Sequence, residues 1–123
     1  MRLAKDTDRP FQHLRALWLI GREGLETQVE LADRLTIDAP AASRLVDRLE
    51  AAGLVARRAG RDRRTFRLVL TRKAAGDIAM FDRALDALDA ELHQHLGAKD
   101  RETLRRVLDR VNQTFVVSCR RTE

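Results

Sequence analysis

The spacing of hydrophobic residues along the chain changes twice, from helical to strand-like and back to helical. In the first part, one apolar stripe begins after Pro10 and ends near Gly21, at the three- and four-residue intervals of a helix that buries one face. Its members are Phe11, Leu14, Leu17, Trp18 and Ile20. This stripe predicts a helix over residues 11–22.

Two shorter helices follow, and each is preceded by a residue that can cap it. Thr27 and Glu30 have the spacing of a capping box, in which the hydroxyl accepts from the amide three residues later and the carboxylate reaches back. Asp38 is a favourable N-cap for the next helix, which has Pro40 in its first turn. The two predicted helices span residues 28–35 and 39–52, and a tight turn joins them.

The period then shortens to that of a strand. Gly53 suits the end of the preceding helix, and residues 54–58 and 65–70 are rich in β-branched or aromatic side chains with partial alternation. Residues 59–64, between them, are polar and contain a glycine. We therefore expect a β-hairpin with a charged tip.

Two long helices complete the pattern, over about residues 71–96 and 99–119, with Gly97 between them. Their apolar residues recur every three or four positions, as in a coiled coil. These residues are Ile78, Phe81, Leu85, Leu88, Leu92, Leu104, Leu108, Val111 and Phe115. The two stripes can form an intramolecular core or pack on a second copy. Because they are wider than one seam, a homodimer is the favoured interpretation.

The predicted fold class is mainly α with a small β-hairpin wing. Two short helices, a tight turn and a two-stranded hairpin make a winged helix-turn-helix over residues 10–73. A helical dimerisation region follows over residues 74–120. In a helix-turn-helix the second helix enters the major groove of DNA, and a hairpin tip can reach the adjacent minor groove.

Charge supports a polyanionic partner. The net charge is +5, yet eight cations and one acid between Arg57 and Lys73 give that segment a charge of +7. The remainder of the chain is therefore slightly acidic, and a local cationic block on such a body favours a binding site over general solubility. The alternative is a solvated arginine-rich loop.

The helix over residues 39–52 separates into two faces at 100° per residue. The side expected to meet the core consists of Ala42, Leu45, Val46, Leu49 and Ala52. The opposite side carries Pro40, Ser43, Arg44, Asp47 and Ala51, with Arg48 at its edge. Small residues permit close approach to bases, and serine and arginine can contact phosphate or guanine. The alternative is an ordinary surface helix in which Asp47 pairs with Arg44 or Arg48.

These motifs together resemble the MarR family of transcriptional regulators. The matching helix-turn-helix segments are Leu31–Leu35, Ser43–Glu50 and Gly53–Val55. The wing signature of the family is more specific, and here it comprises Asp62, Arg64, Leu70 and Thr71 at the family spacing. Ala74 replaces the glycine that ends the signature, a change that favours the following helix.

The resemblance implies a homodimer that reads a pseudo-palindromic operator in double-stranded DNA, with recognition helices about 34–36 Å apart. It places Pro40, Ala41 and Ser43 at the bases and Arg44 near the backbone, and we add Arg48 to this recognition helix. The wing residues are Arg61, Asp62, Arg63 and Arg64. Arg64 would enter the minor groove, while Asp62 would hold Arg64 or the loop by charge-assisted hydrogen bonds.

A repressor that responds to a small-molecule effector is a further implication of the resemblance. His13, Arg15 and Trp18 are candidates to line a pocket for a small aromatic effector, although a lone aromatic on an apolar stripe is more often part of the core. Family members usually carry a further helix before the first one here, and we expect that helix to be missing or truncated in this chain. We therefore expect a weaker or rearranged dimer and a poorly formed pocket.

Other chemistry is not expected. Cys119 is the single cysteine, so no internal disulfide or metal-binding cysteine pair is possible, and its role as an oxidant sensor is an open alternative. His93 and His95 point about 200° apart on a helix and cannot easily share a metal. No catalytic triad, carboxylate pair or phosphate loop is visible, so we expect no enzyme, cofactor or metal. Without a long apolar run, a cytoplasmic protein with no membrane contact is expected.

A second function remains open. The winged helix can serve as an interaction module that binds a protein instead of an operator. Six arginines between Arg57 and Arg67 argue against it, because protein interfaces rarely need such a density of positive charge. RNA binding is less favoured because no aromatic stacking platform is visible.

Overall fold

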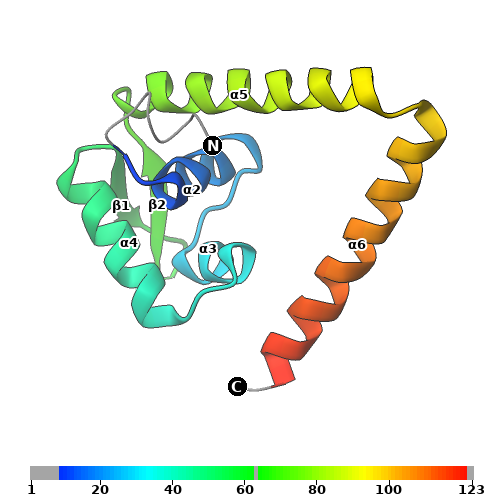
Figure 1. The fold of residues 1–123 in the computed structure, drawn as a ribbon. Coiled ribbons are helices and arrows are strands. Elements are labelled where there is room, and N and C mark those ends of the chain that lie inside the picture. Colours follow the sequence, from blue (N-terminus) through cyan, green and yellow to red (C-terminus); the bar gives the residue numbers. More distant parts are fainter. Residues whose placement is uncertain (1–8, 63, 122–123) are drawn as a thin grey trace. The chain divides into compact units, whose positions relative to one another are not determined.

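The computed structural model describes residues 9–62 and 64–121, with the side chains of residues 115–121 excluded. Its elements in chain order are α2 (Phe11–Arg22), α3 (Gln28–Leu35), α4 (Ala39–Ala51), β1 (Val55–Ala59), β2 (Phe66–Leu70), α5 (Ala74–His95) and α6 (Ala98–Arg121) (Figure 1). A mainly helical fold with one antiparallel hairpin confirms the predicted fold class.

The chain forms two compact units, one ending at Arg83 and the other beginning at Ala84. In the first unit, α2, α3 and α4 gather around the hairpin (Figure 1). The boundary lies inside α5, so the first turns of this helix belong with the winged helix. The division of the chain into a DNA-binding and a dimerisation region concerns function, and it remains a proposal.

The two short helices are capped largely as the sequence predicts. The Thr27 hydroxyl accepts from the amide of Glu30 at 3.1 Å. The Glu30 carboxylate accepts from the amide of Glu26 at 3.2 Å instead of from that of Thr27. Asp38 accepts from the amide of Ala41 at 2.8 Å. The bonds from the amides of Glu30 and Ala41 satisfy donors that a helix start leaves without intrahelical partners.

The turn between α3 and α4 contains a backbone conformation unusual for its residue. Thr36 ends α3 in the left-handed region, with φ 56° and ψ 48°. The amide of Ile37 donates to the carbonyl of Ala32 at 3.1 Å, which closes the end of the helix. A β-branched residue in this region is strained, so the surrounding packing must hold the turn in place.

The hydrophobic core lies between the three short helices and one face of the hairpin. Leu14, Leu17, Leu31, Leu49 and Leu54 are among its largest fully buried side chains. Aliphatic residues therefore supply most of the burial, as the low aromatic content of the sequence requires. This core fixes α4 and the base of the hairpin in one body.

Two residues expected in a dimer interface belong to the first unit instead. Ile78 is 8% exposed and Phe81 is 4% exposed, and Ile78 lies in the main core cluster. The Phe81 ring packs against the rings of Phe11 and Trp18, with centroids 5.8 and 5.9 Å away. For these two residues the structure therefore has the intramolecular core that the sequence left as the alternative, while the homodimer itself stays a prediction.

The hairpin pairs Val55 with Leu70 at its base and Ala59 with Phe66 near its tip. The amide of Leu68 also donates to the carbonyl of Glu26 at 2.7 Å, which ties the chain before α3 to β2. The amide of Thr71 donates to the carbonyl of Leu54 at 3.0 Å. Thr71 thus stays with the sheet, and α5 begins at Ala74 and not at residue 71.

A polar contact joins α2 to the beginning of α5. The indole N–H of Trp18 donates to Asp82 Oδ1 at 2.7 Å, and Arg22 Nε donates to Asp82 Oδ2 at 2.9 Å. The hydrogen bonds from Arg22 and then Trp18 hold the pKa of Asp82 below its usual value of 3.8. Together with the three aromatic rings, this contact fixes the first turns of α5 to the winged helix.

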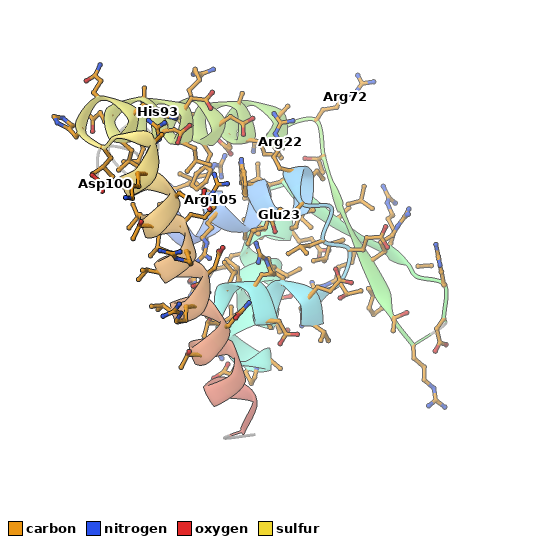
Figure 2. The ribbon with its side chains drawn as sticks, turned by 90° about the vertical axis from the view of Figure 1, so that its right-hand side faces the viewer. Arg22, Glu23, Arg72, His93, Asp100 and Arg105 are labelled. Atoms are coloured by element: carbon orange, nitrogen blue, oxygen red, sulfur yellow. The ribbon has the colours of Figure 1, made fainter. Side chains whose placement is uncertain are left out.

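The second unit contains the rest of α5 and α6. In it, Arg101 Nη1 donates to the carbonyl of Leu96 at 3.3 Å, beside the turn that joins the helices. His93, Asp100 and Arg105 lie along these two helices (Figure 2). Several large apolar side chains of this unit remain exposed, namely Leu88, Leu104, Val107, Leu108 and Val111. Among the described residues, no helix is both long and apolar enough to cross a membrane.

Asp82→Asn is expected to lower the stability of the first unit at pH 7, because the ion pair with Arg22 is lost. The pKa of Asp82 is lower in the folded chain, so its contribution is present at neutral pH and is lost as the pH falls below 3.8. Thermal unfolding of the parent chain and of Asp82→Asn, at pH 7 and at pH 3, measures the contribution of Asp82 to stability. The difference in midpoint should shrink at pH 3, and an equal difference at both pH values would contradict the assignment.

Candidate nucleic-acid interface

The helix α4 divides into a buried and an exposed face where the sequence predicts. Ala42, Leu45, Val46 and Leu49 are buried. The residues of α4 open to solvent are Ala39, Pro40, Arg44, Asp47, Arg48, Glu50 and Ala51. Ala41 and Ser43 are half-buried at the edge of this face. The structure therefore presents two arginines and a series of small residues along one exposed side of α4.

The tip of the hairpin is held by hydrogen bonds to Asp62. Its carboxylate accepts from the amide of Arg64 at 3.4 Å. Its carbonyl accepts from the amide of Thr65 at 3.1 Å and from the Thr65 hydroxyl at 3.2 Å. The amide of Gly60 donates to the carbonyl of Thr65 at 3.0 Å. Asp62 is expected from the sequence to hold either the Arg64 side chain or the loop. In the structure its carboxylate holds the loop, through the backbone amide of Arg64.

The arginines of the wing are exposed. Arg58 lies on β1, Arg61 and Arg64 lie in the loop, and Arg67 lies on β2, all with solvent-exposed side chains. Arg63, also predicted for this site, lies outside the described residues. Arg72 projects outward at the opposite end of the hairpin (Figure 2). The wing thus presents cations along its length.

Two cations in the same block are engaged within the protein. Lys73 Nζ donates to the carbonyl of Ala52 at 2.9 Å, beside the end of α4. Arg57 Nη1 lies 2.8 Å from Asp47 Oδ1, so Asp47 pairs with Arg57 and not with Arg44 or Arg48, the partners named in the alternative interpretation of this helix. The alternation of side chains along a strand could have predicted this contact. Arg57 is two residues after the buried Val55 and therefore points to the same face of the hairpin.

The candidate pocket residues all lie on α2. Trp18 packs against the core and uses its indole N–H on Asp82. Arg15 Nη2 donates to the carbonyl of Arg34 at 3.5 Å. His13 is half-buried, and its pKa is lowered by burial first and then by repulsion from Arg48 and Arg9. The core interpretation of Trp18 thus has structural support, while an effector role for the three residues remains a prediction.

The histidines considered as metal ligands are not part of a metal-binding cluster among the described residues. His93 Nε2 lies 3.8 Å from Asp89 Oδ2, one helical turn away. Across residues 9–62 and 64–121, no group of three or more histidine, cysteine, aspartate or glutamate side chains is placed to hold a metal. The side chains of Phe115 and Cys119 lie outside the described residues, so their predicted roles are not tested.

A helix-turn-helix joined through one core to an arginine-bearing hairpin defines a winged helix-turn-helix protein. The sequence profile of the MarR family matches residues 7–65. A variant of E. coli MarR in complex with operator DNA is 29% identical, with a TM-score of 0.72, over 89% of this chain and 79% of that chain. These two matches together support the assignment of the chain as a MarR-family winged-helix regulator.

Two more distant structures show the same fold. A MarR protein from Peptoclostridium difficile superimposes with a TM-score of 0.85 at 15% identity, over 98% of this chain and 79% of that chain. The MepR protein of S. aureus, in complex with DNA, gives a TM-score of 0.76 at 21% identity, over 91% of this chain and 83% of that chain. Both matches extend well beyond the residues of the family profile.

Gly60→Ala is expected to disturb the wing. A Cβ at this position would lie 2.8 Å from the backbone oxygen of Thr65, which cannot yield without moving the loop. We expect the variant to lose about 1–3 kcal/mol of unfolding free energy, as overpacked sites do. Chemical denaturation measures the loss.

Gly76→Ala is the matched control, because Gly76 lies in α5 and its added Cβ would meet nothing within 4 Å. This control should gain up to about 1 kcal/mol, since alanine favours a helix. Equal stability changes in the two variants would show that the loop around Gly60 is not tightly packed.

Proposed function

We propose that this chain is a sequence-specific regulator of transcription that binds double-stranded DNA as a homodimer. The observation that carries the proposal is that α4 and the wing are fixed to one another by a common hydrophobic core. Arg44 and Arg48 line the exposed side of α4, and four exposed arginines among the described residues line the hairpin. In this arrangement α4 enters the major groove, and the wing tip, with Arg61 and Arg64, reaches the adjacent minor groove.

One pair of wing arginines supports a phosphate partner in particular. Arg58 and Arg67 are directly opposite one another in the hairpin register, and both are exposed. Like charges at opposite positions destabilise a hairpin, because their Cβ atoms lie only about 5 Å apart. A phosphate placed between them relieves that repulsion, so the unfavourable pair is consistent with a DNA-binding role.

Within α4, the smaller residues are proposed to approach the bases. Pro40, Ala41 and Ser43 lie in the first turns of the helix, where a recognition helix contacts base edges. Arg44 directly follows Ser43 and is proposed to contact the backbone. MarR and MepR have been crystallised with DNA, and these relatives support the same use of the fold here.

The homodimer is proposed to form through the second unit. The exposed side chains of Leu104, Val107, Leu108 and Val111 recur every three or four residues along α6. Such a stripe is stabilised when a second helix covers it. Leu85, Leu88 and Leu92 on α5 extend the apolar surface, and Phe115 would continue the α6 stripe. Ile78 and Phe81, being buried, contribute by fixing α5 to the winged helix.

Repression is proposed as the consequence of operator binding, because a dimer bound across two half-sites excludes other proteins from that DNA. An effector would act by changing how the two recognition helices match the half-sites. His13 and Arg15 on α2 are the proposed effector contacts, with Trp18 contributing its ring. The division of labour is then residues 10–73 for DNA and residues 74–120 for dimerisation.

Selection of sites from a random duplex pool, followed by a salt titration, tests the proposal. We expect a pseudo-palindromic site whose binding constant falls steeply with salt, since phosphate contacts release counterions. If no sequence is enriched, the chain is not an operator-binding regulator. If the chain instead captures a protein with little salt dependence, the alternative of an interaction module is favoured.

Arg64→Ala is expected to weaken binding to the selected duplex by about 1–3 kcal/mol if Arg64 makes a specific groove contact. Folding should remain intact because the Arg64 side chain is exposed. Arg106→Ala on α6 is the control, since it also removes one exposed arginine but outside the winged helix. Fluorescence anisotropy at fixed salt compares them. Equal losses would remove the wing tip from the interface.

Leu108→Glu is expected to weaken the dimer. Leu108 is 52% exposed and lies in the α6 stripe, where a buried carboxylate would cost several kcal/mol in the interface. Arg106→Glu is the control, because position 106 lies on the opposite side of the helix from the stripe. Sedimentation equilibrium should show a more monomeric Leu108→Glu variant. If both variants associate like the parent chain, the dimer does not use this stripe.

A further inference from the structure

Arg57 differs from the other wing arginines in its surroundings. Its side chain is only 21% exposed, whereas the neighbouring Arg58 is open to solvent. In the hairpin register Arg57 is opposite the buried Leu68, and Arg58 is opposite the exposed Arg67. Arg57 therefore extends from the inner face of the hairpin, beyond the edge of the hydrophobic core.

The guanidinium of Arg57 joins three elements. Its Nη1 lies 2.8 Å from Asp47 Oδ1 and 3.4 Å from Glu50 Oε1, both on α4. Its Nη2 donates to Gln28 Oε1 at 3.3 Å, at the start of α3. The backbone amide of Arg57 also donates to Glu50 Oε2 at 3.3 Å. A planar guanidinium can serve several acceptors at fixed angles, which a lysine cannot do.

The position of Asp47 gives these contacts a consequence for DNA binding. Asp47 lies on the same exposed face of α4 as Arg44 and Arg48, and its side chain is 62% exposed. An unpaired carboxylate there would repel the phosphates that the face must approach. Pairing with Arg57 neutralises it and directs it toward the hairpin.

We propose that Arg57 is a positioning residue that fixes the wing relative to the recognition helix and neutralises Asp47, without itself contacting DNA. The inference rests on the proposed function, and it adds a determinant of operator affinity inside the protein. The cationic block is thus divided between arginines that meet the ligand and one that orients them.

The first test compares Arg57→Gln with Arg58→Gln on the duplex selected from the random pool. Arg57→Gln should lower affinity roughly tenfold, which corresponds to one lost charged contact, and leave the salt slope unchanged. Arg58→Gln should lower both affinity and the salt slope, the latter by about one. A slope reduced by about one in Arg57→Gln would overturn the proposal, because Arg57 would then contact phosphate.

Asp47→Asn separates positioning from a general loss of stability. In the parent chain this substitution should change affinity little, because Arg57 already neutralises the carboxylate. In the Arg57→Gln background it should raise affinity several-fold, since the unpaired charge is removed. An equal effect of Asp47→Asn in both backgrounds would show that Arg57 and Asp47 act independently, contrary to the proposal.

A conservative variant tests the geometry. Arg57→Lys keeps the charge and the aliphatic stem, so it should fold, but one ammonium cannot serve Gln28, Asp47 and Glu50 together. It should recover only part of the lost affinity. Full recovery would show that charge alone matters and would overturn the positioning role.

A measurement without DNA keeps the inference independent of the proposed function. Amide hydrogen exchange should accelerate in β1 and β2 of Arg57→Gln, whereas Arg58→Gln should show no acceleration, because its loss also relieves the repulsion with Arg67. If exchange is unchanged in Arg57→Gln, the positioning role is wrong. If the parent chain binds no duplex but the exchange result holds, the proposed function fails while the positioning role stands.

Discussion

The burial of Val55 and Leu68 beneath the short helices is the interaction on which the rest of the structure depends. A hairpin of two strands is only marginally stable in water by itself, so the wing needs an anchor. These two side chains provide it on the inner face, and the bond from Leu68 to the carbonyl of Glu26 adds a third attachment beside α3. The same core buries one face of α4. The recognition helix and the wing therefore keep a fixed relation because they share one apolar interior.

Sequence reasoning succeeded where local chemistry decides the structure. The hydroxyl of Thr27 and the carboxylate of Asp38 cap the helices that follow them, and the two faces of α4 follow from a helical period. It failed where a distant partner decides. The spacing of Ile78 and Phe81 does not say which surface they meet, and that surface is the winged helix itself. The hydrogen bond between Trp18 and Asp82 joins residues 64 positions apart, and no local sequence pattern predicts it.

The candidate site was predictable as a region but not as a set of roles. Counting charge treats every arginine between residues 57 and 67 alike, whereas the structure separates them by exposure and partners. Arg58 and Arg67 face each other in solvent, while Arg57 is held between Asp47, Glu50 and Gln28. The formal charge of +7 therefore overstates the number of cations that a ligand can meet. Arg57 is engaged within the protein, where it joins the hairpin to α3 and α4.

Thr36 has a consequence for the order in which the chain folds. A left-handed conformation costs a β-branched residue about 1–2 kcal/mol, so the isolated sequence around it does not favour the turn. In the folded chain Leu31 and Leu35 on one side and Leu45 on the other are buried in one core cluster, and we infer that this packing offsets the cost of the turn. The two helices of the motif should therefore acquire their final angle late, with the collapse of the whole first unit, and not as an autonomous folding nucleus.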